Sequence, residues 1–515
     1  MPFKGICELM IGETSATWMA DLSETGLGRV GVVDIGSNSI RLVVYDAPTR
    51  LPIPIFNEKT ECGLVRGMAK TGRLHPEGVS RALRSLWRFH LLTQSMGIER
   101  IALVATAAVR EALDGTEFAQ QVGQIFGIPV RVISGNEEAR LSAVGLLSGY
   151  TKADGLIADL GGGSCDFMEL NEGSFGLSGS VPLGHVRLKE AAKGSTRNSK
   201  MIVAKYLATV PWLTGVENRT LFLAGGSWRA LARVFIHDLN YPLHVIDGFT
   251  LRTGEANSLS SVIASCGAKI NADVLGISMS RYSTLPYSAA VLLGLLHACN
   301  PKSIVFAGFG MREGQMLEML PPRVRSQDPL LAGCARMAER MGRFAITGEE
   351  IFDWMSPIFP STRDDVSRIR MAACILSDIG WSEHPDYRAE HAFLRVLRIP
   401  FAGLTHHNRV LLAVIIFVRY KGNAANSVVH PVRSLLSDSD ISIAESVGYA
   451  LRIAHKLSGS APDLLSTTKF IVDSHSIELV LPKNNMGGGN IFVSEAVKSP
   501  LCALASSLNK SLRLS

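Results

Sequence analysis

The chain has 515 residues, of which 47% are apolar and 19% charged, and its formal net charge is +6. A chain of this length is too long for one hydrophobic core, so about two to four domains are expected. A charge of +6 over 515 residues does not indicate a general nucleic-acid binder, and the composition is typical of a globular rather than a disordered protein.

Cysteine spacing and hydropathy both predict a cytoplasmic protein. The eight cysteines are scattered without a Cys-x-x-Cys pair, which fits free thiols in a reducing compartment and offers no zinc-ligand spacing. The longest candidate for a membrane span, Val410 to Val418, is too short to cross a bilayer and is typical of a buried helix. Residues 1–28 lack a convincing signal peptide and are expected to form a disordered leader. We expect neither membrane nor nucleic acid among the partners.

The first patterned stretch is an apolar hairpin expected over residues 30–46. At its centre lies Val32-Val-Asp-Ile-Gly-Ser-Asn-Ser-Ile-Arg-Leu42. Two apolar strands flank an aspartate, Asp34, and a turn of glycine and small polar residues. Because glycine has no side chain, such a turn lets the backbone come close to a ligand.

A helix and a buried strand are expected next. The helix, over Glu77–Met96, is opened by Pro76 and carries arginines at three- and four-residue spacing on one face. These arginines are Arg81, Arg84 and Arg88. A solvated basic face and contact with a polyanion explain them about equally well. The strand, over residues 101–105, leads into a helix beginning near Arg110.

A glutamate pair follows the short strand expected at residues 130–133. Ser134 or Asn136 could cap the next helix, which places Glu137 and Glu138 in its first turn. Acidic residues there complement the helix dipole, so the pair has an ordinary structural explanation. Without further context that explanation is favoured.

The most informative stretch is Ile157-Ala-Asp-Leu-Gly-Gly-Gly-Ser-Cys-Asp-Phe-Met-Glu-Leu170. Three consecutive glycines remove every Cβ, so backbone N–H groups can close on a large anion. Asp159 stands at the mouth of the turn, and carboxylate oxygen is the ligand that Mg²⁺ prefers. A turn that holds both a phosphate and its metal indicates phosphoryl chemistry.

This turn repeats the pattern of the first hairpin. The matched positions are Asp34 with Asp159, Gly36 with Gly161, and Ser39 with Ser164. A single glycine-rich hairpin would be unremarkable as a structural feature. Two copies far apart in the sequence predict two related lobes that face each other across a cleft.

Two further strands end in glycine turns. Leu221 to Leu223 leads into Ala224-Gly-Gly-Ser227, and Ser303 to Ala307 leads into Gly308-Phe-Gly-Met-Arg-Glu-Gly314. Glycine turns at helix N-termini suit anions. Strands that alternate with helices predict α/β lobes with ligands at the strand ends.

The pattern changes beyond about Gln327. Residues 330–460 are mostly helical in pattern and predict a separate all-helical domain. A small hairpin is expected at 470–472 and 477–481. The stretch Met486-Gly-Gly-Gly-Asn490 is typical of a flexible linker, and residues 491–515 are expected to form a tail that can end in a helix.

Five of these motifs, in this order, resemble the exopolyphosphatase / guanosine pentaphosphate phosphohydrolase (Ppx/GppA) family of the actin, Hsp70 and sugar-kinase superfamily. They are Asp34-Ile-Gly-Ser-Asn-Ser-Ile-Arg-Leu42, Ala105-Thr-Ala-Ala-Val-Arg-Glu-Ala112, Ile133-Ser-Gly-Asn-Glu-Glu-Ala-Arg140, Asp159-Leu-Gly-Gly-Gly-Ser164 and Ala307-Gly-Phe-Gly-Met-Arg-Glu-Gly314. The resemblance covers residues 30 to about 320. It implies two ribonuclease-H-like lobes around a catalytic cleft.

The resemblance also implies roles for individual residues. Glu137 is implied as the general base that activates water, and Arg110 as the cleft arginine that steadies phosphate charge. Phosphate contacts are implied for Ser37, Asn38, Gly161, Gly162 and Ser164. Metal contacts are implied for Asp159, Asp34 and Asp166. Asp166 occupies a position where the family often has Glu, so it keeps the charge but has a shorter reach.

The implied activity is metal-dependent hydrolysis of the terminal phosphate of inorganic polyphosphate, with Mg²⁺ or Mn²⁺, by a homodimer. The implied domains are a leader over 1–28, lobes over 29–155 and 156–326, a helical HD-like domain over 327–485, and a linker and tail over 486–515. In the helical domain Ser377-Asp378 stands where a working HD site has His-Asp, and His384, His391, His406 and His407 lack a clear ligand pattern. A scaffold role is therefore expected for this domain.

Other functions stay open at this stage. Hydrolysis of guanosine pentaphosphate would use the same cleft with a guanosine behind the terminal phosphate. A non-catalytic sensor of alarmone or phosphate is a different class, which the carboxylates and glycine turns argue against. A phosphotransferase like the sugar kinases is a weaker alternative.

Overall fold

A computed structural model describes residues 28–46, 49–98, 100–341, 347–360, 363–482 and 494–514. The chain divides into two compact units, the first ending at Gln327 and the second beginning at Asp328. The leader expected over residues 1–28 lies almost entirely outside the described residues.

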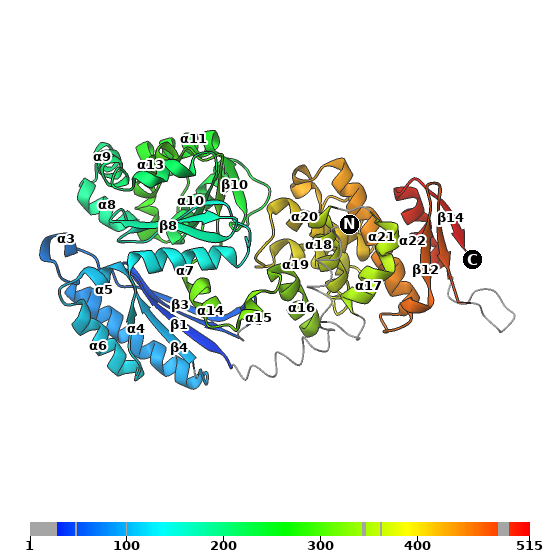
Figure 1. Ribbon diagram of the computed structural model, residues 1–515, viewed down its shortest axis with the longest axis horizontal. Coiled ribbons are helices and arrows are strands. Elements are labelled where there is room, and N and C mark those ends of the chain that lie inside the picture. The colour runs from blue at the N-terminus through cyan, green and yellow to red at the C-terminus, as the bar shows by residue number, and fades with distance from the viewer. Residues whose placement is uncertain are drawn as a thin grey trace. The chain divides into compact units, whose positions relative to one another are not determined.

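The first lobe of the N-terminal unit contains a five-stranded sheet in the order β3-β2-β1-β4-β5. Its strands are β1 (Val30–Ile35), β2 (Ser39–Tyr45), β3 (Pro54–Glu61), β4 (Arg100–Ala105) and β5 (Arg131–Val132). Strands β1 and β2 are antiparallel, with Asp34 opposite Arg41, which confirms the predicted hairpin. Helices α4 (Pro76–Ser95), α5 (Ala107–Glu111) and α6 (Gly115–Phe126) accompany the sheet (Figure 1). Leu86 and Phe89 of α4 are fully buried in its core.

The second lobe repeats this arrangement with a six-stranded sheet in the order β10-β11-β9-β6-β7-β8. Its strands are β6 (Gly155–Leu160), β7 (Cys165–Asn171), β8 (Ser174–Val181), β9 (Thr220–Ala224), β10 (Phe249–Arg252) and β11 (Ser303–Phe306). Its main helices are α8 (His185–Ala192), α9 (Thr196–Leu207), α10 (Gly226–Asp238), α11 (Thr253–Cys266) and α13 (Leu285–Cys299). Each lobe contains the antiparallel hairpin that the duplicated turns predicted, and a parallel strand adjoins each hairpin.

Two helices that are far apart in sequence cross at close range in this unit. They are α7 (Gly135–Leu147) and α14 (Met311–Glu318). A Cβ on Gly314 would lie 1.9 Å from the carbonyl oxygen of Leu141, so only glycine permits this approach. Met316 and Leu317 of α14 pack in one cluster with β1, so the chain returns to the first sheet after completing the second.

The C-terminal unit is mostly helical. Its helices are α16 (Pro329–Met341), α17 (Gly348–Met355), α18 (Asp364–Ile375), α19 (Arg388–Arg398), α20 (His406–Arg419), α21 (Asp438–Ser458) and α22 (Glu495–Ser507). The apolar run Val410–Val418 lies within α20 and is buried, as predicted. Within the described residues, no helix is both long and apolar enough to span a membrane.

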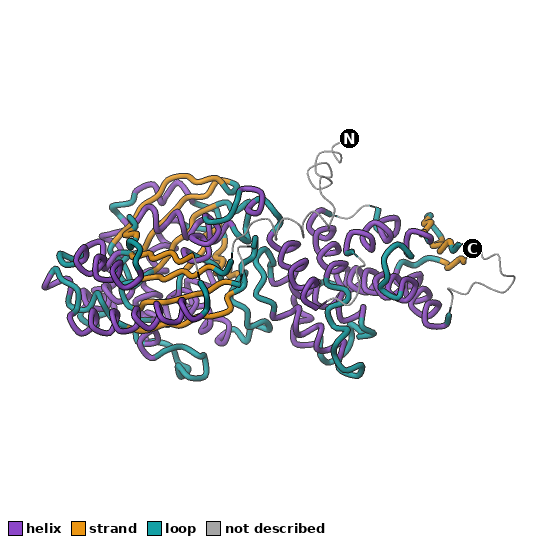
Figure 2. The backbone as a smooth tube through the Cα atoms, turned by 90° about the horizontal axis from the view of Figure 1, so that it is seen from below, coloured by secondary structure: helices purple, strands orange, loops and turns teal. Residues whose placement is uncertain are grey.

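A three-stranded sheet follows the helices, whereas the described residues within 330–460 contain helices and no strand, as expected for that stretch. Strands β12 (Lys469–Val472) and β13 (Ser476–Val480) form the predicted hairpin, and β14 (Ser511–Leu514) pairs in parallel with β13. Figure 2 shows strands in orange near the C-terminus. Because α22 buries Val497, Leu501 and Leu504, the end of the chain belongs to the folded unit. The linker expected at 486–490 lies outside the described residues.

Candidate active site

A cleft of ≈ 150 Å³ lies where β1 and β6 end in their turns. The walls include the following residues predicted from sequence: Asp34, Ser37, Asn38, Asp159, Gly161, Gly162 and Ser164. Residues from both lobes therefore form one site.

The two turns are built alike and touch each other. In the first, the N–H of Gly36 donates to the carbonyl of Ser39, and in the second Gly161 donates to Ser164, each over 3.0 Å. A Cβ on Gly163 would lie 2.8 Å from the Ser37 Oγ, so a side chain there would collide with the first turn. Glycine at this point keeps the backbone open to an anion.

The structure places the second glutamate of the pair, not the first, in the cleft. Glu138 lines the cleft and its side chain is 12% exposed. Glu137 is absent from the cleft walls and forms an ion pair with Arg131 at a side-chain exposure of 30%. Ser134 caps α7, and each residue turns a helix by about 100°, so neighbouring glutamates point to different sides.

Glu138 has the environment of a reactive carboxylate. Its Oε2 is buried and accepts no hydrogen bond from any residue that the structure describes, and Arg110 Nη1 is 3.6 Å away. Burial raises the pKa of Glu138 well above its ordinary value, the negative charges of Asp166 and Asp159 raise it further, and Arg110 opposes them. A carboxylate with a raised pKa is a stronger base than an ordinary glutamate, which suits it to take a proton from water.

Arg110 and Asp166 lie behind the cleft walls rather than on them. Arg110 Nη1 donates to the carbonyl of Ile133 over 2.8 Å and flanks Glu138. Asp166 is 1% exposed and accepts hydrogen bonds from Ser164 Oγ, at 2.8 Å, and from Ser180 Oγ. Burial raises the pKa of Asp166 to about 7. Because both its oxygens accept from serines, Asp166 supports the glycine turn and is poorly placed to bind a metal directly.

Asp34 and Asp159 are the two aspartates on the cleft wall. Asp34 is 3.7 Å from Arg312 Nε, and Asp159 accepts a hydrogen bond from the fully buried Ser142 of α7. Burial raises the pKa of both carboxyl groups, with Arg312 opposing the shift at Asp34 and Ser142 opposing it at Asp159. The described residues form no group of three or more His, Cys, Asp or Glu side chains around one point. Mg²⁺ fits such a site, because it needs only one or two carboxylates when waters and substrate phosphates complete its shell.

Five basic side chains also line the cleft, and sequence reasoning missed them as site residues. They are Arg41, Lys59, Arg229, Arg281 and Arg312. Arg41 and Arg312 lie inside two of the motifs identified from sequence, so their positions in those motifs could have predicted that they line the cleft. Lys59 and Arg281 stand in no such motif, and only the fold brings them to the cleft. Burial lowers the pKa of Arg41 and Arg229 to about 10, which leaves both charged at neutral pH.

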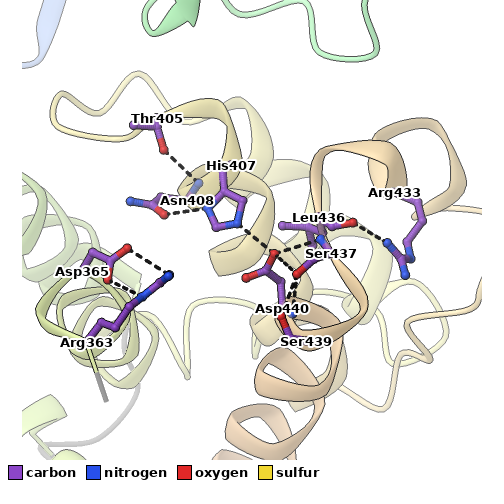
Figure 3. A network of polar contacts seen from close by, with 10 residues as sticks. All are labelled: Arg363, Asp365, Thr405, His407, Asn408, Arg433, Leu436, Ser437, Ser439 and Asp440. Atoms are coloured by element: carbon purple, nitrogen blue, oxygen red, sulfur yellow. Dashed lines mark hydrogen bonds and ion pairs between the residues drawn. The ribbon is translucent and has the colours of Figure 1, made fainter. Parts of the chain in front are cut away.

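The histidines of the C-terminal unit form pairs rather than a metal centre. His407 Nε2 lies 3.0 Å from Asp440, which also accepts from the backbone and hydroxyl of Ser437 (Figure 3). His391 lies 3.0 Å from Glu383. Each of these histidines contacts a single carboxylate, and no cluster of metal-ligand type occurs in the part of this unit that the structure describes.

Comparison with known proteins places the chain in a family. The model of the Ppx/GppA phosphatase family matches residues 42–323, and that of the exopolyphosphatase C-terminal domain matches residues 339–501. An exopolyphosphatase structure from Cytophaga hutchinsonii is 21% identical over 56% of this chain and 97% of its own, with a TM-score of 0.51. The Aquifex aeolicus member of the family is 22% identical over 56% and 96%, with a TM-score of 0.47. At 21% identity the Cytophaga structure establishes a shared fold alone. The family match covers more than half of the sequence, and the chain therefore belongs to the Ppx/GppA phosphatase family and is a phosphohydrolase.

Proposed function

We propose that this protein is an exopolyphosphatase that removes the terminal phosphate of inorganic polyphosphate with the help of a divalent metal. The observation that carries the proposal is the composition of the cleft. Five basic side chains and two glycine turns line the same cleft as Glu138, a carboxylate with a buried oxygen that accepts no hydrogen bond from the described residues. Carboxylates and basic side chains line the same cleft, so the cations and the turn N–H groups can hold phosphate oxygens while a water beside Glu138 supplies the nucleophile.

The chemistry requires little covalent participation by the protein. Hydrolysis of a phosphoanhydride needs a water in line with the leaving oxygen and neutralisation of the charge on the phosphoryl oxygens. In our proposal Glu138 accepts the proton of that water. The N–H groups of the turns at Ser37 and Gly162, together with Arg229 and Arg312, hold the phosphoryl oxygens. Arg110 acts behind Glu138 by steadying its charge.

We propose Mg²⁺, with Mn²⁺ as a substitute, as the cofactor. Asp34 and Asp159 would hold it, since both line the cleft and their mutual repulsion favours a cation between them. When bound, a divalent metal neutralises the charge on substrate phosphates. Asp166 is left out of this set because its oxygens accept from Ser164 and Ser180.

Guanosine pentaphosphate is the second candidate substrate. One observation favours polyphosphate: no phenylalanine, tyrosine or tryptophan lines the cleft within the described residues, whereas purine bases commonly stack on such rings. Phosphate release from long-chain polyphosphate and from guanosine pentaphosphate, measured side by side with Mg²⁺, ranks the two. Faster release from the nucleotide would reverse the assignment, and release from neither substrate would leave a non-catalytic phosphate or alarmone sensor.

We further propose a cytoplasmic homodimer in which the HD-like helical part of the second unit acts as a scaffold. The paired histidines and the absence of a metal-ligand cluster among its described residues support a scaffold rather than a second catalytic centre. Light scattering on the full chain after size exclusion tests the dimer, and a monomeric mass would refute it.

A further inference from the structure

His185 is a buried histidine on the cleft wall that has no part in the proposed hydrolysis. It begins α8, is 6% exposed, and donates its backbone N–H to the carbonyl of Gly161 over 3.1 Å. A Cβ on the preceding Gly184 would lie 2.3 Å from the Gly162 carbonyl, so the start of α8 lies directly on the glycine turn. The imidazole is thereby held beside the place where a terminal phosphate would bind.

The hydrogen bonds of Thr284 determine which ring nitrogen carries the proton. His185 Nδ1 lies 2.9 Å from Thr284 Oγ1. The threonine hydroxyl donates its single proton to the carbonyl of Arg281, also over 2.9 Å. It can therefore only accept from the ring, so Nδ1 bears the hydrogen and Nε2 bears a lone pair. In the described part of the chain, no hydrogen bond is made to Nε2.

The surroundings of His185 keep the ring neutral. Burial lowers its pKa to about 3, and the cations Arg281 of the α12 turn (Met279–Tyr282), Lys59 of β3 and Lys189 of α8 lower it further. Glu61 of β3 is the charge that opposes them. A neutral ring cannot attract phosphate as a cation, so His185 presents a hydrogen-bond acceptor among basic donors.

We propose that His185 Nε2 accepts a hydrogen bond from a phosphate P–OH group and thereby distinguishes the end of a phosphate chain from its interior. A terminal phosphate has a second ionisation, at about 6 for a phosphate monoester, and so carries a proton in part of the neutral range. Each interior phosphate has one strongly acidic hydroxyl, which is ionised throughout that range. This specificity role rests on the proposed function, because it concerns the substrate of the same cleft.

Phosphate and sulfate provide a test that does not depend on turnover. At about pH 8, above the second ionisation of phosphate, both are dianions of similar shape, but only hydrogen phosphate carries a proton. Calorimetry on the full-length wild-type protein should give tighter binding of phosphate than of sulfate, by about three- to tenfold for one neutral hydrogen bond. His185→Phe, which keeps a ring but removes the acceptor, should bind the two anions equally.

Two variants control for the fold and for the tautomer. His185→Gln retains an oxygen acceptor and should keep part of the phosphate preference, even if the phenylalanine variant is unstable. Thr284→Val removes the partner that fixes the proton on Nδ1, and should weaken the preference. An unchanged phosphate-to-sulfate ratio in His185→Phe or in Thr284→Val would overturn the role assigned to Nε2.

Hydrolysis kinetics connect this role to the substrate. With long-chain polyphosphate, the ratio of KM for His185→Phe to KM for the wild type should be about three to ten below the second ionisation of the chain end, and should approach one above it. A ratio that is the same at every pH would mean that Nε2 does not detect the terminal proton. Failure of the wild type to release phosphate would instead refute the proposed function, while the calorimetric comparison would still decide the role of His185.

Discussion

Replacing Glu138 by glutamine should lower the catalytic rate and at the same time raise the stability of the protein. The amide keeps the shape of the side chain but cannot accept a proton from water. General-base catalysis contributes about 10²–10⁴-fold, so kcat for phosphate release should fall by that factor. Glu137→Gln is the matched control, because Glu137 is partly exposed and its ion pair with Arg131 is of the surface kind, worth about 0–1 kcal/mol. Its kcat should stay within about threefold of the wild type.

The same substitution should make the protein more stable. Burial raises the pKa of Glu138 in the folded state above the ordinary value of 4.5. The unfolded chain therefore ionises first as pH rises, and the wild type loses stability from about pH 4.5 up to the folded-state pKa. Glutamine does not ionise, so the difference in Tm between Glu138→Gln and the wild type should be small near pH 4.5 and clearly positive near pH 8.

The change in kcat is measured by phosphate release from polyphosphate, and the change in Tm by thermal unfolding of the same samples across pH. A loss of activity in Glu137→Gln with retention in Glu138→Gln would refute the assignment of the base. If the Tm difference between Glu138→Gln and the wild type does not grow with pH, the pKa of the buried carboxylate is not raised in the folded state.

Three further outcomes follow from the site and its supports. The charge of Asp166 raises the pKa of Glu138, so kcat/KM should decline as the pH falls through the pKa of Glu138, and Asp166→Asn should move that decline to lower pH in a pH–rate profile. Gly314→Ala should lower stability by about 1–3 kcal/mol in urea unfolding, since its Cβ would meet the Leu141 carbonyl, whereas Gly254→Ala in α11, with nothing within 4 Å, should not. Chelation of divalent metal should abolish phosphate release, with recovery on adding Mg²⁺ or Mn²⁺, and activity that survives chelation would contradict the proposed cofactor.

Local sequence patterns predicted the two lobes and the two glycine turns that line the cleft. Both turns follow apolar strands and contain the glycines that a close backbone approach requires, so Asp34, Asp159 and Gly162 could be assigned to one cleft before the fold was known. The order of strands and helices likewise predicted the α/β architecture. These features depend on residues that are neighbours in the chain, which is why sequence alone reveals them.

The function of each charged side chain was decided by tertiary packing. The sequence does not distinguish Glu137 from the adjacent Glu138, but the rotation of helix α7 directs Glu138 into the cleft. The close crossing of α14 and α7 brings Arg312 to the cleft wall. Ser164 and Ser180 donate hydrogen bonds to Asp166, and Thr284, about a hundred residues away in sequence, fixes the proton of His185 on Nδ1. Burial and long-range hydrogen bonding determine which ionisable side chains of the cleft carry a proton, and both arise only when distant segments pack together.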